Sequence, residues 1–154
     1  FDAEGLGSRK YTLIKDGVLQ QWLLDLSSAK QLNLEPFGNA KRGISGPPSP
    51  GTSNFMILPG KITPENLIKG ISNGFYVTDM IGSSVSMITG DYSRGASGFW
   101  IKNGELSIPI TEATIAGNLK EMFMTLQPAN DLDFSHSMNS PTLLIEGMTI
   151  AGNS

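Results

Sequence analysis

The chain of 154 residues contains no cysteine and a single histidine, His136. Without cysteine it can form no disulfide, and it offers neither a thiolate metal ligand nor a cysteine nucleophile. A zinc site usually takes three or four ligands from histidine, cysteine and carboxylate side chains, and the sequence has no HExxH pair. We therefore expect no cofactor in this chain. The lack of cysteine also suits the cytoplasm, where we expect the protein to reside.

Positive charge is also sparse. The chain has 11 basic and 14 acidic residues, which gives a net charge of −3, and only Arg9, Arg42 and Arg94 are arginines. Binding to a nucleic-acid backbone needs clustered basic side chains that release counterions, whereas these are scattered. No apolar run approaches the roughly 18 residues that a membrane helix needs. We expect neither a nucleic-acid partner nor a membrane partner.

Glycine and proline are abundant, with 18 and nine residues, and they separate short apolar runs. Asp16-Gly17 and Asn103-Gly104 predict two β-hairpins, because these residues tolerate the positive φ of a type I′ turn. Further strands are predicted over 55–58, 75–80, 84–88, 106–110, 132–134 and 142–145. The pattern predicts a strand-dominated α+β fold, with a mostly antiparallel or barrel-like sheet and two or three short helices. A chain of this length is expected to form a single domain over 1–154.

Three segments carry helix signals. A helix over 27–34 would have Ser27 or Ser28 as its N-cap. A second helix starts at Thr63, which is followed by proline at the first helical position and an acid in the first turn. A third helix over 118–126 has four apolar residues at helical spacing: Leu119, Met122, Phe123 and Leu126.

A short sequence repeats near the end of the chain. Thr114-Ile115-Ala116-Gly117-Asn118 recurs over 149–153. We interpret this as reuse of favourable strand-end chemistry, with a structural duplication as the alternative.

Two arginines lie inside glycine-rich segments, Arg42 within 38–52 and Arg94 within 90–98. Such segments can bring backbone N–H groups and a guanidinium to one anion or carboxylate, or the arginine can pair with a local acid. The glycines of 90–98 also indicate a bulge, a bend or a close backbone approach. An exposed strand edge nearby could bind an extended peptide. We predict partner or peptide contacts at Asn39, Arg42, Ser93, Arg94 and Gly95.

Two hydrolytic alternatives have little support. A serine hydrolase would need His136 as the base for Ser93 or Ser97, and the GxSxG motif is not completed around Ser97. Asp131 and Asp133 alternate along a predicted strand and would share one face, but a solvated strand edge has the same pattern. We therefore predict no catalytic residue and no metal ligand in this chain.

Six runs of the sequence, in order, are similar to one protein family. They are 9–19, 38–43, 48–51, 90–104, 114–119 and 141–152. The runs GDYSRGASGFW from Gly90 and TIAGNL from Thr114 are the most specific. The chain resembles the C-terminal portion of the PmbA/TldE branch of the TldD/PmbA family, metalloproteases that are also called modulators of DNA gyrase. Its start at Phe1 fits a piece of a longer protein.

The resemblance implies that the catalytic centre lies outside this chain. TldD-like members carry an HExxxH zinc helix upstream and a cysteine ligand in the C-terminal part, and this chain has the matching tail without the cysteine. Members of the PmbA/TldE branch lack the zinc ligands and pair with a TldD-like subunit, which is expected to hold the zinc. The pair is implicated in cutting small peptides.

The resemblance therefore implies a non-catalytic subunit domain of a hetero-oligomeric metallopeptidase. Its partners would be a TldD-like catalytic subunit and small peptide substrates. One alternative is an independent metallopeptidase with its zinc ligands upstream of this chain. The other is a gyrase-modulating binding module without enzyme activity. A homo-oligomer of the isolated protein is also left open.

Overall fold

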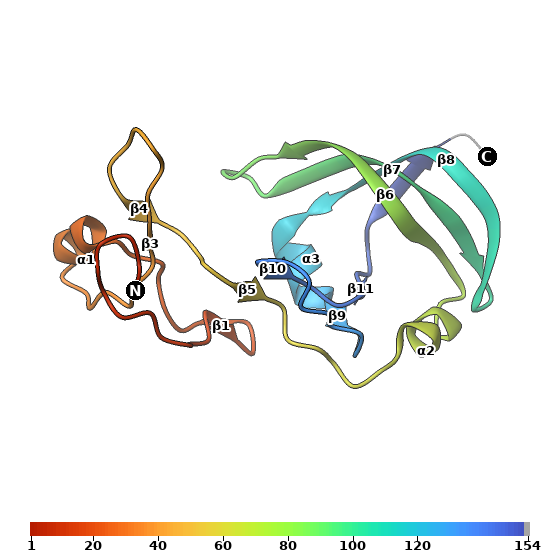
Figure 1. Ribbon diagram of the computed structural model, residues 1–154. Helices are drawn as coiled ribbons and strands as arrows, with labels where there is room; N and C mark the ends of the chain where they lie inside the picture. The colour runs from red at the N-terminus through yellow and green to blue at the C-terminus, as the bar shows by residue number, and fades with distance from the viewer. Residues whose placement is uncertain (153–154) are drawn as a thin grey trace. The chain divides into compact units, whose positions relative to one another are not determined.

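The computed structural model describes residues 1–152, apart from the side chain of Ser83, and the chain divides into two compact units. The first unit contains Phe1–Met56 and Ser135–Met138, and the second contains Ile57–Phe134 and the chain from Asn139 onward. Their ribbons are drawn in Figure 1. The expectation of a single domain over 1–154 stays a prediction.

The first unit consists of short elements joined by turns. They are β1 (Ile14–Lys15), β2 (Val18–Leu19), α1 (Leu26–Leu32), β3 (Ala40–Lys41), β4 (Ser49–Pro50), β5 (Phe55–Met56) and Met138 of β10 (Met138–Asn139). The predicted turn at Asp16-Gly17 is confirmed, because both residues have positive φ between the paired strands β1 and β2. β3 pairs with β4, so the glycine-rich segment 38–52 is a hairpin.

Helix α1 has Asp25 as its N-cap, so the prediction of Ser27 or Ser28 was wrong. The Asp25 carboxylate accepts a hydrogen bond from the Ser28 N–H at 2.7 Å. Hydrogen bonds from the Ser28 side chain and backbone hold the pKa of Asp25 below its ordinary value. A carboxylate suits the positive end of the helix better than a serine hydroxyl does, which explains the earlier start.

The second unit is built on a four-stranded antiparallel sheet. Its strands in spatial order are β12 (Thr149–Gly152), β8 (Glu105–Asn118), β7 (Asp91–Lys102) and β6 (Asn73–Val85). The other elements are α2 (Pro64–Lys69), α3 (Leu119–Thr125) and the paired strands β9 (Gln127–Pro128) and β11 (Leu143–Leu144). The sheet is open and curves over α3 and β11 (Figure 1). The strand-dominated, antiparallel α+β prediction with short helices is confirmed, with an open sheet rather than a barrel.

The second predicted hairpin joins β7 to β8 around Asn103-Gly104, where both residues have positive φ. The register between the two strands shifts between Ala96 and Gly98, which marks a bulge. A Cβ atom on Gly98 would overlap the carbonyl oxygen of Tyr76 on β6. Both the predicted bulge and the predicted close backbone approach are therefore present in the glycine-rich run.

Two local predictions for the second unit were wrong. β6 is one strand with two register shifts rather than two strands over 75–80 and 84–88, because bulges absorb the break in its apolar pattern. Residues 132–134 form no strand. The predicted helix over 118–126 is confirmed as α3, on which Met122 is buried and Phe123 is 67% exposed.

The predicted start of α2 is confirmed. Thr63 is the N-cap, and its hydroxyl accepts a hydrogen bond from the Asn66 N–H at 3.3 Å. Pro64 occupies the first turn, as expected for a residue without a backbone N–H. Leu67 of this helix is buried and lies with the small core of the unit.

The repeated sequence has a structural meaning. β12 pairs antiparallel with β8 so that Ile150 lies opposite Ile115 and Thr149 opposite Ala116. The two copies of TIAG are therefore neighbours in one sheet. Asn153, the last residue of the second copy, lies outside the described residues.

Candidate functional site

The two most specific sequence runs meet at one end of the sheet. The run from Gly90 starts β7, and the run from Thr114 ends β8. Their strands pair so that Asp91 lies opposite Asn118 and Tyr92 opposite Gly117. Two segments that are distant in sequence thus form one local structure, which is the first candidate site.

A polar network holds the turn between β6 and β7, here called the β6–β7 tip (residues 86–90). The Asn118 amide Nδ2 donates to the Thr89 carbonyl at 3.0 Å and to the Asp91 carboxylate at 3.4 Å. The Thr89 hydroxyl donates to Asp91 Oδ2 at 2.6 Å. The backbone N–H of Leu119 donates to the Gly90 carbonyl at 2.7 Å. The tip is therefore fastened to the start of α3.

Gly90 is required at this point for two reasons. Its φ is +82°, a conformation that other residues rarely adopt. A Cβ atom there would lie 3.1 Å from the Asn118 side chain, the group that organises the network. The glycine at the head of the GDYSRG run therefore shapes the tip.

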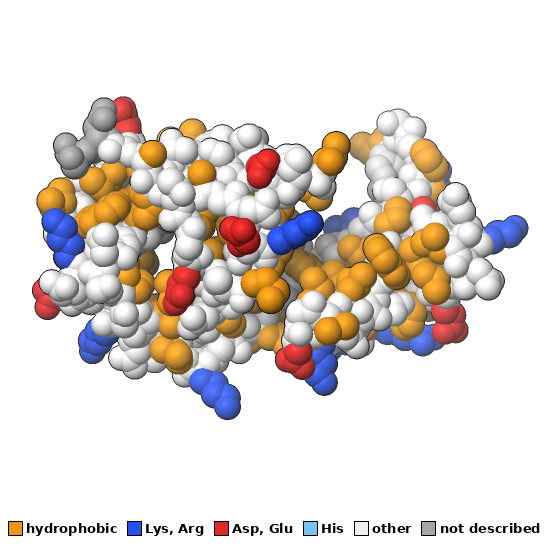
Figure 2. Space-filling model, turned by 180° about the vertical axis from the view of Figure 1, so that it is seen from behind, with side chains coloured by type: hydrophobic (Ala, Val, Ile, Leu, Met, Phe, Trp, Pro, Cys, Tyr) orange, Lys and Arg blue, Asp and Glu red, His pale blue; other side chains and the backbone are white. Residues whose placement is uncertain are grey.

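The tip exposes two large apolar side chains. Met87 is 87% exposed and Ile88 is 96% exposed. Apolar side chains stand out at the end of the β6–β7 hairpin in the space-filling view (Figure 2). Met87 and Ile88 are therefore two adjacent apolar side chains, on a hydrogen-bonded turn, that a partner could cover.

Arg94 lies on the inner face of the sheet, the side that carries the buried residues. It pairs with Ile115 on β8, and Ala96, two residues further along β7, pairs with Ala113. Ala96, Ala113 and Ile115 are all buried. Residues that pair directly, or that stand two apart on a strand, share a face. The guanidinium thus shares a face with the core, while Ser93 and Gly95 belong to the outer face.

A groove of about 1020 Å³ lies within the second unit, here called the inner groove. Its lining is mainly apolar and comes from α2, β6, the inner face of the sheet and residues 142–148. The sheet contributes Met80, Tyr92 and Ile115 to this lining, whereas Arg94, which pairs with Ile115, is not part of it. Its one charged lining residue among those described is Glu146.

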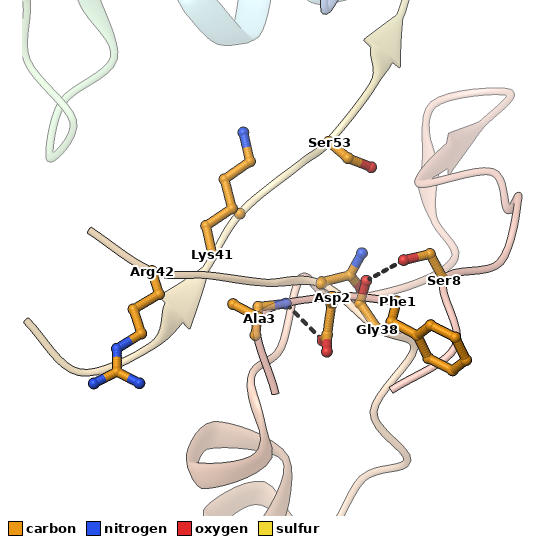
Figure 3. A pocket seen from close by; sticks show the side chains of 11 residues that line it. Phe1, Asp2, Ala3, Ser8, Gly38, Lys41, Arg42 and Ser53 are labelled. Carbon is orange, nitrogen blue, oxygen red and sulfur yellow. Dashed lines mark hydrogen bonds between the residues drawn. The ribbon is translucent and has the colours of Figure 1, made fainter. Parts of the chain in front are cut away.

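Asn39 and Arg42 belong to the first unit and line one shallow pocket of about 320 Å³. Arg42 Nε donates to the Gly46 carbonyl at 3.3 Å, so part of this side chain braces the β3–β4 loop. The side chains of Lys41 and Arg42 leave the chain on opposite sides (Figure 3).

Asp2, which lines the same pocket, has a structural role. Its carboxylate accepts hydrogen bonds from the backbone N–H groups of Ala40, Glu4 and Leu6. These bonds, chiefly that from Ala40, lower the pKa of Asp2.

The predicted contact residues therefore fall into two groups. Asn39 and Arg42 share a pocket of the first unit, and Ser93, Arg94 and Gly95 are consecutive on β7 of the second. Two buried side-chain polar atoms in the described part of the chain have no hydrogen-bond partner, namely Asn39 Oδ1 and Arg94 Nε. Asn39 and Arg94 are both among the residues predicted from the sequence to contact a partner or peptide. That role stays a prediction.

Asp131 has a structural role instead of acting as one of two catalytic carboxylates. Its oxygens accept from the Thr142 backbone N–H at 2.9 Å and from the Thr142 hydroxyl at 2.7 Å. These bonds, the hydroxyl's first, lower the pKa of Asp131 from its ordinary 3.8. Asp133 Oδ1 accepts from the neighbouring Phe134 N–H at 2.7 Å. The idea of two carboxylates on one strand face fails, because this segment is irregular.

Replacing Asp131 with alanine is expected to lower the free energy of unfolding at neutral pH by about 1 kcal/mol, as the carboxylate is exposed and screened by solvent. Because the folded pKa is depressed, the stabilisation is present above pH 3.8 and is lost as the pH falls through the folded pKa. Urea unfolding of wild type and variant at neutral and acidic pH measures this. If the difference in free energy of unfolding between wild type and Asp131→Ala stayed the same in acid, the structural role of the Asp131 carboxylate would be contradicted. Thr142→Val should lower the free energy of unfolding in the same way but by less.

The described residues do not fit a metal site. Within residues 1–152, no three side chains of histidine, cysteine, aspartate or glutamate gather where they could hold a metal ion together. None of the helices in that range combines the length and the apolar character needed to cross a membrane.

Comparison with known proteins decides the family. The family described as PmbA/TldA metallopeptidase C-terminal domain matches residues 1–152. The chain belongs to this family. It is 40% identical to the metalloprotease PmbA of Escherichia coli O157:H7 over 99% of its own length and 32% of that protein. Identity is 27% to a metalloprotease TldD homologue of Buchnera aphidicola subsp. Acyrthosiphon pisum, with 98% and 35% covered.

The fold of this PmbA/TldA-type domain also matches a solved structure. The crystal structure of TldE from Thermococcus kodakarensis superposes with a TM-score of 0.86 and 30% identity, covering 98% of this chain and 36% of that one. The domain therefore spans about a third of the length of the relatives that it matches.

The β6–β7 tip of the PmbA/TldA-type domain was missed in the sequence. Met87 and Ile88 were assigned to a strand over 84–88, because apolar residues following polar ones resemble a half-buried strand. The available signal was Thr89-Gly90-Asp91, a run of turn-forming residues directly after the apolar pair.

Proposed function

We propose that this chain is the C-terminal domain of a non-catalytic PmbA/TldE-type subunit, which docks a TldD-like metallopeptidase subunit and helps to hold small peptide substrates. The observation that carries the proposal is the β6–β7 tip. Membership in the metallopeptidase family, together with the higher identity to PmbA than to the TldD homologue, supports the choice of branch.

The tip supports docking because it is both apolar and held in place. Two nearly fully exposed apolar side chains gain free energy when a partner removes them from water, by roughly 1.5–3 kcal/mol each. The hydrogen bonds among Thr89, Asp91 and Asn118 fix the turn beforehand, so little conformational entropy is lost on binding. Such a preorganised apolar projection suits a specific protein–protein interface.

The peptide-holding role rests on the edge of the sheet and the inner groove. β6 is an edge strand of 13 residues, so one row of its backbone groups is free of strand partners in the sheet. Its residues Asn73–Thr78 also line the inner groove. An extended peptide could add to this edge through main-chain hydrogen bonds and place alternate side chains against the apolar lining. Small peptides are the substrates we propose for the assembled pair.

Zinc is proposed to reside in the TldD-like subunit and not in this domain. The domain brings no cysteine and one histidine, and its acidic side chains are dispersed. It would therefore shape the substrate chamber and position the peptide, while the partner carries out the cleavage. Cytoplasmic location is part of the same proposal.

Peptide hydrolysis by full-length proteins tests the function. The full-length protein, the TldD-like subunit and their mixture are each assayed on a short unstructured peptide, with and without a chelator. We expect activity in the mixture that chelation abolishes, and none in the full-length protein alone. Chelator-sensitive hydrolysis by the full-length protein alone would indicate metal ligands upstream. Binding to gyrase with no effect on the TldD-like subunit would favour the adaptor alternative.

A further inference from the structure

We propose that the inner groove binds the N-terminal end of a short apolar peptide, and that Glu146 receives the free α-ammonium group of that peptide. The inference deepens the proposed function, on which it rests for the class of ligand. It states which end of the peptide the groove takes and which residue selects that end.

The first step is the charge of the groove. Apolar residues dominate its lining, among them Leu67, Leu143 and Ile145. Glu146 belongs to this lining, and no lysine or arginine is among the described residues that form it. A hollow with apolar walls and charge of a single sign concentrates the electric field and attracts the opposite charge. The inner groove therefore suits an apolar ligand that carries one positive charge.

The second step is the position of Glu146. It lies in the connection between β11 and β12, and it is exposed. The Thr125 hydroxyl at the end of α3 donates to the Glu146 carbonyl at 3.1 Å, and the next residue, Gly147, has a φ of +80°. The hydrogen bond ties this connection to α3. Because the residue is exposed, its carboxylate stays hydrated, and therefore charged at little cost, before a ligand arrives.

The third step is the size and shape of the ligand. The groove volume of about 1020 Å³ lies at the upper end of the roughly 300–1,000 Å³ that is usual for small-ligand sites, so it accommodates a short segment of peptide. Residues 73–78 of β6 line the groove, and β6 is an edge strand of the sheet. A peptide main chain can therefore pair with β6 while its side chains contact the apolar lining.

The fourth step is the choice between the two cations that an apolar peptide can offer, the α-ammonium and a lysine side chain. The α-ammonium is attached to the main chain beside the first side chain, so main-chain pairing with β6 also orders it. A lysine must order a stem that carries about 2 kcal/mol of rotamer entropy. A terminal carboxylate beside Glu146 would be repelled. The N-terminal end of the peptide is therefore the end that fits.

The test uses the full-length protein and the peptide Leu-Val-Ala-Leu, labelled at its C-terminus and prepared with a free or an acetylated N-terminus. A third peptide is acetylated and has lysine in place of alanine. Dissociation constants are measured by fluorescence anisotropy at low salt, without the TldD-like subunit. We expect the free amine to bind about 5-fold more tightly than either acetylated peptide, the upper end for an ion pair in contact with solvent. Higher salt should reduce this difference.

Two variants of Glu146 test its role. Glu146→Gln should abolish the preference for the free amine, and Glu146→Lys should make the acetylated peptide bind more tightly than the free one. The matched control is Glu112→Gln, which removes an exposed carboxylate of β8 outside the groove lining. The control should leave the ratio of the two affinities unchanged. All three variants should keep the wild-type melting temperature, because both glutamates are exposed.

Equal affinity of the wild type for the free and acetylated peptides would overturn the proposal, and so would a preference that survives in Glu146→Gln. Tighter binding of the acetylated lysine peptide than of the free amine would also overturn it, because the groove would then select a side chain. The proposal fails as well if no peptide binds the full-length protein alone. Hydrolysis by the mixture with the TldD-like subunit is a separate measurement, so a failure of the proposed function and a failure of this inference are distinguishable.

Discussion

Gly98→Ala is expected to lower the free energy of unfolding by about 3 kcal/mol or more. The new Cβ would overlap the Tyr76 carbonyl oxygen and lie 2.9 Å from the Tyr76 carbonyl carbon and 3.1 Å from the Thr78 nitrogen. All three are backbone atoms of β6, so no side-chain rotation relieves the contact. The two strands must separate locally, and the hairpin that carries the tip loses its register.

Urea unfolding of the full-length protein, followed by circular dichroism, measures this loss. Gly95→Ala is the matched control on the same strand, because its Cβ would meet the Ile81 carbonyl oxygen at 3.5 Å, an ordinary contact. We expect the control to change stability by less than about 1 kcal/mol. Equal midpoints for the two variants would show that β6 and β7 do not approach as closely as described.

The double substitution Met87→Ser with Ile88→Ser is expected to weaken association with the TldD-like subunit by about 100-fold or more. Burying two such side chains contributes roughly 3 kcal/mol or more in total, and each 1.4 kcal/mol is a factor of ten. Both residues are almost fully exposed in the domain itself, so its stability should not change. The dissociation constant from analytical ultracentrifugation and the melting temperature report the two effects separately.

The matched control also replaces two exposed apolar residues, but at the end of the sheet opposite the β6–β7 tip. Leu106 and Ile108 on β8 are 48% and 58% exposed, near the turn at Asn103-Gly104. Leu106→Ser with Ile108→Ser should leave the association unchanged. If this control weakened the complex as much as the tip variant does, general hydrophobicity rather than the tip would drive the contact.

Turns and helix starts with local chemistry could be predicted from the sequence. Asn103-Gly104 and Asp16-Gly17 determine their turns with two residues each, and Thr63-Pro64 determines the start of α2. These features depend on φ preferences and on hydrogen bonds within a few residues. The antiparallel, strand-dominated architecture followed from the same signals.

Features that depend on distant partners could not be predicted. The backbone N–H of Leu26, at the start of α1, donates to the Glu4 carboxylate at 2.8 Å, a contact across 22 positions. The β6–β7 tip is held by Asn118, far along the chain from Thr89. A pattern of apolar and polar residues carries no information about such pairings.

In the candidate site, too, some features could be predicted from local sequence and others depend on pairing with a distant strand. Arg94 and Gly95 were noticed because they lie in a glycine-rich run, but only the sheet register shows that Arg94 is on the inner face and Gly95 on the outer one. One residue of difference in register would exchange the two faces. The composition identified the segment, and the pairing with Ile115 places Arg94, whose buried Nε has no hydrogen-bond partner among the described residues, on the inner face.

Photocrosslinking from the β6–β7 tip tests the central claim, that this tip docks the TldD-like subunit. A photoreactive amino acid replaces Ile88 in the full-length protein, which is mixed with the TldD-like subunit and irradiated, with position 108 as the control. We predict a crosslink to the TldD-like subunit from position 88 and none from position 108. Absence of a crosslink from position 88 in a mixture that hydrolyses peptide would contradict the claim.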